Sequence, residues 1–228
     1  GHEEVCRALL TAGARPDGAR ADRATPLWIA AQCGHQHVAR LLLAAGASVD
    51  HPRSADTSTW RACCWPPGHT DTQTHAAVDS RAVRTPARGA PAAGHTQTHR
   101  HTPLWIAAQC GHQHVARLLL AAGASVDHVR QDGATPLFKA AHKGHAAVVV
   151  ELLKYKPNLG LLPNGQSALH GAAMFGQLSC ARLLARRGGA AGLRMRSAAG
   201  LTPAQAAQAA GRSDVRVATV YSRTERII

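Results

Sequence analysis

Residues 25–51 read TPLWIAAQCGHQHVARLLLAAGASVDH, and residues 102–128 repeat this string without a change. Weaker copies of its first half begin at Thr135 (TPLFKAAHKGH), Ser167 (SALHGAAMFGQ) and Thr202 (TPAQAAQAAGR). Counted from the start of the second copy, the intervals are 33, 32 and 35 residues. A period of about 33 residues is typical of a helical solenoid, in which each unit packs on the next.

One unit contains the residues of two short helices. In the unit that begins at Thr135, the threonine hydroxyl can cap a helix. Pro136 suits the first position of this helix, because the backbone N–H that proline lacks would have no hydrogen-bond acceptor there. We expect Gly144 to end this helix in the left-handed conformation. Apolar residues from Val148 to Leu153 predict the buried side of a second helix. Two such helices cannot bury both faces alone, so each pair must stack on its neighbours.

These residues resemble the ankyrin repeat family, whose motif is close to DGxTPLHxAAxxGHxxVVxLLLxxGA. The resemblance covers residues 1–51 and 102 to about 217. It implies an all-α, ankyrin-type helical solenoid with short β-turn fingers, and a scaffold rather than an enzyme. Lys156 and Pro157 depart from the motif, which has Gly-Ala at these positions. The extra residues that make the last interval 35 residues long lie between Arg187 and Met195.

The segment from 52 to 101 interrupts the units. It contains no Leu, Ile, Phe, Met or Tyr, so it lacks the side chains of a hydrophobic core, and we predict a disordered low-complexity insert. An alternative is that the insert and the second copy are translated noncoding or duplicated DNA. The sequence then divides into a partial and one full repeat (1–51), the insert (52–101), repeats with a C-terminal cap (102–217) and a tail (218–228).

The two identical copies present identical lower faces to the unit that begins at Thr135. We therefore predict two registers of stacking. In one, all units follow in line and 52–101 is looped out. In the other, the first copy docks on that unit and residues 52–128 are excluded.

The composition is strongly basic. The 228 residues carry 26 Lys and Arg against 13 Asp and Glu, a formal charge of +13, and arginines concentrate in residues 182–228. This favours, as an alternative function, electrostatic binding of that section to nucleic acid or an acidic surface. No aromatic platform stands beside these arginines, so we do not expect a nucleic acid partner. No apolar stretch approaches the roughly 18 residues of a membrane span. A product without function is a third alternative.

Motifs of catalysis are missing from the sequence. It has no GxxxxGK[ST] loop, no GxSxG elbow and no paired carboxylates on a helix face, so we predict that the chain is not an enzyme. Cys33, His35 and His37 have a spacing that could suggest a metal site, but the ankyrin motif places His35 in a structural position, and we expect no metal or cofactor. We expect Trp28 and Trp105, which replace the motif histidine, to pack between repeats. Six cysteines without a disulfide pattern favour a reducing compartment, cytoplasm or nucleus.

A binding surface follows from the ankyrin resemblance, which implies that finger tips and the ends of the first helices line a concave surface. We expect an unknown protein partner there, bound by a monomer, with Phe175, Met174 and Arg130 as anchors. The alternative for each single residue is an ordinary solvated position. The predicted protein-binding residues are Gln32, Cys33, Gln109, Cys110, Arg130, Gln131, Asp132, His142, Lys143, Met174 and Phe175.

Overall fold

The computed structural model describes residues 2–20, 23–51, 53–55, 99–130, 133–163, 165–212 and 214. Within these residues the chain forms ten helices and one sheet of two short strands. The helices are α1 (Glu3–Thr11), α2 (Pro26–Cys33), α3 (Gln36–Ala44), α4 (Pro103–Cys110), α5 (Gln113–Ala121), α6 (Pro136–Lys143), α7 (Ala146–Lys154), α8 (Ala168–Met174), α9 (Leu178–Arg194) and α10 (Pro203–Ala209). The strands are β1 (Arg53–Ala55) and β2 (His99–His101).

The first helix of a unit begins and ends as its sequence predicts. The Thr135 hydroxyl accepts a hydrogen bond from the backbone N–H of Phe138 at 3.2 Å, and Pro136 is the first residue of α6. Gly144 follows the helix in the left-handed conformation, with a φ of 83°. These local signals define where α6 begins and ends.

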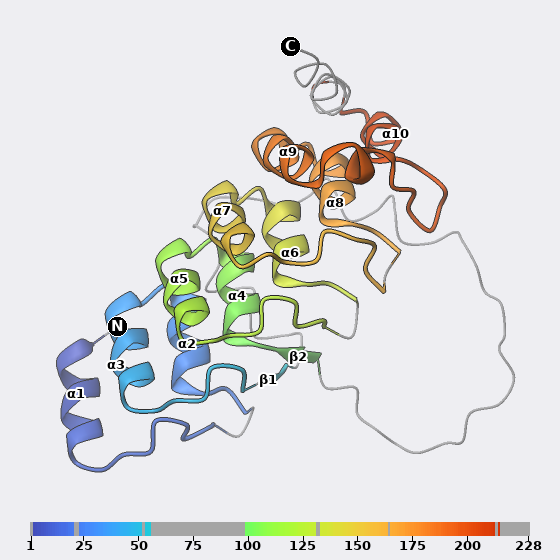
Figure 1. The fold of residues 1–228 in the computed structure, drawn as a ribbon. Helices are drawn as coiled ribbons and strands as arrows, with labels where there is room; N and C mark the ends of the chain where they lie inside the picture. The colour runs from blue at the N-terminus through green and yellow to red at the C-terminus, as the bar shows by residue number, and fades with distance from the viewer. Residues whose placement is uncertain are drawn as a thin grey trace, which may run out of the picture.

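The helices form two rows in a stack (Figure 1). An inner row contains α2, α4, α6, α8 and α10, and an outer row contains α1, α3, α5, α7 and α9. The core lies between the rows and between successive units, where Leu137, Ala140, Val148 and Leu152 are fully buried. Small alanines let the inner helices approach one another closely, and the aliphatic side chains fill the remaining space. The prediction of a helical solenoid is therefore confirmed.

The loops between units form the predicted β-turn fingers, which project on the side of the inner row (Figure 1). In the finger before α6, the Arg130 N–H donates to the Ala134 carbonyl at 3.1 Å, and the Gly133 N–H donates to the Arg130 carbonyl at 2.9 Å. The finger before α8 closes in the same way, from Leu162 N–H to the Gln166 carbonyl at 2.9 Å.

The two identical copies are consecutive units of one stack. Helix α2 packs on α4, and α4 packs on α6, so the structure has the in-line register. This arrangement retains every interface between units, whereas excluding 52–128 would leave one unit without its neighbours. The second register stays a prediction.

The ends of the predicted insert differ from the prediction. Residues 53–55 and 99–101 pair as antiparallel strands, with Arg53 opposite His101 and Ala55 opposite His99. Backbone hydrogen bonding between strands can form without apolar side chains, so the lack of a hydrophobic pattern did not exclude it. Residue 52 and residues 56–98 lie outside the described part of the chain.

The two ends of the stack are less regular than its middle. In α9, Gly189 has a non-helical backbone (φ 57°, ψ −153°), which accommodates the extra residues between Arg187 and Met195 as a kinked continuation of the helix. At the other end, α1 packs on α3, and its Val5 and Leu9 are 56% and 55% exposed. The division into four parts stays a prediction, and the tail at 218–228 lies outside the described residues.

Among the residues that the structure describes, no helix is both long enough and apolar enough to span a membrane.

Candidate protein-binding surface

The inner face is the side of the stack formed by the inner helices and the fingers, and it contains the predicted binding residues. Gln32 and Gln109, at equivalent places near the ends of α2 and α4, are only 7% and 8% exposed. Cys33 and Cys110, which end these helices, are half-buried. The glutamine side chains therefore offer little area to a partner, because α2 packs on α4 and α4 packs on α6.

The backbone beside these glutamines has a structural role. His145 Nε2 lies 2.9 Å from the carbonyl oxygen of Gln109, and His112 Nε2 lies 2.9 Å from that of Gln32. The His145 ring packs on Gly111, where an added Cβ would lie 2.6 Å from Nδ1. Burial lowers the pKa of His145, while its hydrogen bond to the Gln109 carbonyl acts in the opposite direction. This histidine position thus joins one unit to the unit before it. The ankyrin motif gave the equivalent His35 a structural position, and these contacts agree with that interpretation.

Trp105 organises the middle of the inner face. Its side chain is 1% exposed, which confirms the prediction that this tryptophan packs between repeats. The Arg130 guanidinium carbon lies 5.1 Å from the Trp105 ring centre, and Lys139 Nζ lies 5.5 Å from it. His101 contacts the same ring edge-on at 4.5 Å. The buried ring therefore holds two cationic side chains at the surface by cation–π attraction.

A second aromatic group extends over α6 and α8. The His142 ring centre lies 6.3 Å from that of Phe138 and 3.8 Å from that of Phe175. Phe138 is buried, and it fits against Gly171, where an added Cβ would lie 3.0 Å from its ring. Phe175 is 39% exposed. Aromatic side chains are enriched at protein interfaces, so the exposed Phe175 is a candidate contact residue.

The structure brings together one part of the predicted set. His142 contacts Phe175, and the neighbours Lys143 and Met174 end α6 and α8, with Lys143 exposed and Met174 half-buried. The Met174 sulfur also lies 3.7 Å from Gln166 Nε2. Gln131 and Asp132 lie outside the described residues. The sequence reasoning missed Lys139 as a surface cation, although its place one residue after the motif aromatic was a usable signal.

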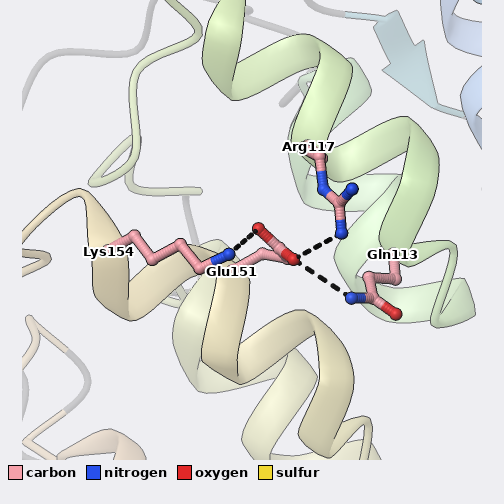
Figure 2. A network of polar contacts seen from close by, with 4 residues as sticks. All are labelled: Gln113, Arg117, Glu151 and Lys154. Atoms are coloured by element: carbon pink, nitrogen blue, oxygen red, sulfur yellow. Dashed lines mark hydrogen bonds and ion pairs between the residues drawn. The ribbon is translucent and has the colours of Figure 1, made fainter.

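The outer row contains a polar cluster that the sequence did not predict (Figure 2). Glu151 of α7 accepts hydrogen bonds from Arg117 Nη2 at 2.9 Å and Gln113 Nε2 at 3.1 Å, both on α5. Lys154 Nζ lies 2.9 Å from its other oxygen. Donation from Lys154, then from Gln113 and Arg117, holds the pKa of Glu151 down to about 2, although burial acts the other way. The cluster clamps two units together and is remote from the inner face.

Two arrangements that resemble reactive sites have structural explanations. Ser167 Oγ lies 2.7 Å from His170 Nδ1, but His170 is fully buried, and its Nε2 lies 2.9 Å from the Leu201 carbonyl. The pair forms the capping box of α8. Burial raises the pKa of the Cys180 thiol to about 11, which makes it a poor nucleophile. In the described part of the chain, no three His, Cys, Asp or Glu side chains are grouped to hold a metal ion.

The described part of the Arg-rich section, residues 182–212 and 214, belongs mainly to α9 and α10. Arg187 donates to the Leu153 carbonyl at 3.3 Å and so contributes to stacking. Arg216, Arg223 and Arg226 lie outside the described residues.

A family model described as ankyrin repeats (3 copies) matches the chain at residues 1–72, 75–162 and 104–196. These stretches include most of the sequence and every helix from α1 to α9. The similarity therefore agrees with the units seen in the stack.

Curated proteins share part of this region. The chain is 38% identical over 87 residues to the probable E3 ubiquitin-protein ligase XBOS32 of Oryza sativa subsp. japonica, covering 37% of this chain and 18% of that protein. It is 38% identical over 86 residues to the E3 ubiquitin-protein ligase XBAT33 of Arabidopsis thaliana, covering 37% and 17%. It is 35% identical over 91 residues to a transient receptor potential cation channel subfamily A member 1 homolog of Caenorhabditis elegans, covering 39% and 8%. The chain spans less than a fifth of the length of these relatives.

Proposed function

Because this chain belongs to the ankyrin repeat family, we propose that it is a non-enzymatic scaffold that binds a protein partner along its concave inner face. Ankyrin repeats suggest protein–protein interaction, and the matched region of the relatives is the repeat region. The observation that carries the proposal is the side chain of Phe175, which is 39% exposed on the inner face and contacts His142. Exposed aromatic groups of this kind anchor protein interfaces.

The chemistry of the described residues supports a role in binding rather than catalysis. The hydroxyl of Ser167 and the imidazole of His170 are used in a helix cap, and the Cys180 thiol is buried. Relatives with different printed names, ligases and a cation channel homolog, share the same repeat similarity. A common binding module fits these relatives better than a common reaction does.

The finer features of the proposal come from the sequence. The stretch ELLKYKPNLGLLPNGQSALH at residues 151–170 resembles the last units of ankyrin repeat domain-containing protein 29, a likeness that also implies a scaffold. We propose that the chain acts as a monomer in the cytoplasm or nucleus, without a cofactor. Its partner is a protein rather than a nucleic acid.

A pair of equally exposed side chains allows a controlled test. Phe175 on the inner face is 39% exposed, and Val150 on the outer row is 40% exposed. In the full chain, each is replaced in turn by photoreactive benzoylphenylalanine, and crosslinked proteins are counted after irradiation in cell extract. We expect protein partners at position 175 and only background at position 150. Equal crosslinking at the two positions would contradict the assignment of the inner face.

Alanine substitutions provide the complementary test. We expect the combined replacement of His142, Lys143, Met174 and Phe175 by alanine to abolish capture of the crosslinked partner while the circular dichroism spectrum is retained. Capture that persists in this folded variant would reject the proposed surface.

A further inference from the structure

Charge is distributed unevenly between the two rows of helices. Of the carboxylates that the structure describes, none belongs to an inner helix. The inner helix α6 instead carries Lys139, His142 and Lys143, and the finger before it carries Arg130. Lys143 is exposed, and the cation–π contacts of Arg130 and Lys139 with Trp105 keep both groups at the inner face.

The carboxylates near the fingers serve the backbone. Three aspartates at equivalent places each accept a hydrogen bond from a backbone N–H of the following unit, which fixes their orientation between units. These contacts are Asp17 with Ser48 at 2.9 Å, Asp50 with Ser125 at 3.1 Å, and Asp127 with Asn158 at 3.0 Å. Glu151 is buried in the outer cluster. These carboxylates therefore do not line the inner helices beside Lys143.

An apolar surface lies next to the end of α6 that carries Lys143. Phe175 is 39% exposed, Met174 is half-buried, and the Phe175 ring lies 3.8 Å from the His142 ring, which adjoins Lys143 in α6. A ligand that covers α6 and α8 would thus contact the positive charge of Lys143 on α6 and the aromatic side chain of Phe175 after α8. Complementary charge steers a partner to such a surface, and the apolar contact provides affinity that salt does not screen.

From this juxtaposition we infer that the partner segment is an acidic peptide with one large apolar side chain beside its carboxylates. This inference rests on the proposed function and specifies its ligand. The carboxylates lie over Arg130 and Lys143, and the apolar side chain packs on Phe175.

The burial of the rings favours a peptide over a single-stranded nucleic acid. Bases bind to such proteins by stacking on successive exposed aromatic rings. Trp105 is 1% exposed and Phe138 is 8% exposed, so neither ring offers a face to a base. Phe175 and the half-buried His142 contact each other at 3.8 Å between ring centres, so they form one aromatic group and not a series of separate rings on which successive bases could stack.

The test is fluorescence anisotropy with the full chain and four labelled probes. The first is a peptide of about ten residues that contains Glu and Asp around one Phe. The second replaces its acidic residues by Gln and Asn, the third replaces its Phe by Gly, and the fourth is an oligothymidylate of about 15 nucleotides. We expect the first probe to bind most tightly, and each altered peptide to bind about tenfold more weakly, which corresponds to loss of about 1.4 kcal/mol.

Matched charge reversals locate the site. Lys143→Glu on the inner face should weaken the first probe about tenfold, whereas Arg182→Glu on the outer helix α9 should leave it within about twofold. Lys143→Gln, which removes the charge without reversing it, should give an intermediate loss and serves if the reversal unfolds the chain. Binding of the first probe should fall as sodium chloride rises from about 50 to 300 mM.

Equal binding of the acidic and amide peptides would overturn the inference, as would equal effects of the Lys143 and Arg182 reversals. Tighter binding of the oligothymidylate, in competition with the peptide, would overturn it in favour of a nucleic acid. If the acidic peptide fails but crosslinking at position 175 still captures a protein, the inference is wrong while the proposed function stands. If crosslinking also fails, both are wrong.

Discussion

Removal of Arg117 should destabilise the stack, whereas removal of the identical Arg40 should not. Both arginines are exposed and occupy the same place in two identical outer helices. Arg117 Nη2 donates at 2.9 Å to Glu151, while the corresponding place of the unit after Arg40 is filled by Leu118. Substitution of each by alanine therefore isolates one contact in a matched background.

The magnitude follows from the burial of the two partners. The Glu151 side chain is 4% exposed and the Arg117 side chain is 53% exposed. A hydrogen bond to a buried charge contributes about 1.5–3 kcal/mol, whereas an exposed ion pair contributes about 0.2–1 kcal/mol. Because Lys154 and Gln113 still contact Glu151 in the variant, we expect R117A to cost about 1 kcal/mol more than R40A.

Urea unfolding of the full chain, followed by circular dichroism, measures this difference. With a slope of about 2 kcal/mol per molar urea, the midpoint of R117A should lie about 0.5 M below that of R40A. The difference between the two midpoints should shrink in 1 M sodium chloride, because salt screens the charge of the exposed Arg117 side chain. Equal midpoints in low salt would refute the proposed role of the clamp, and a difference that salt leaves unchanged would refute its electrostatic origin.

Three further outcomes follow from the structure. Gly111→Ala should cost about 1–2 kcal/mol more than Gly123→Ala in urea unfolding, because both glycines have positive φ but only at Gly111 would the new Cβ lie 2.6 Å from His145; equal costs would contradict the packing argument. Burial lowers the pKa of His170 below its usual 6.5, so the contribution of His170 to stability is complete above pH 6.5 and is lost as the pH falls below that value. His170→Gln should therefore flatten the dependence of the unfolding free energy on pH between 7 and 5. An unchanged slope would count against this role of His170. Deletion of 52–128 should give a folded chain with one unit fewer, because the first copy then meets the next unit with the same lower face, and an unfolded or aggregated product by circular dichroism and size exclusion would show otherwise.

The repeat period and the local helix signals predicted the stack, because each depends on residues close together in the sequence. Thr135 caps α6 and Gly144 ends it through contacts within a few residues. Phe175, which the ankyrin motif assigned to the binding surface, is exposed in the structure. Whether a partner binds there stays a prediction.

Side-chain contacts across units were harder to predict. Glu151 stands in the apolar run VVVELL, which was a visible anomaly, but its contact with Arg117 depends on how far α7 is displaced from α5. The exposure of Gln32 and Gln109 likewise depends on the closeness of neighbouring inner helices, which the motif does not specify. The pairing of β1 with β2 depends on backbone groups that every residue carries, so the composition of the insert gave no sign of it.

The β1–β2 pair makes the stack a suitable host for an inserted domain. Since Ala55 lies opposite His99, the chain departs from the helices and rejoins them at a single spot. The length of a segment inserted between Ala55 and His99 therefore does not change the distances between the helices. A fluorescent protein or an enzyme whose own ends are close together would fit at this junction, and it would project from the finger side of the stack.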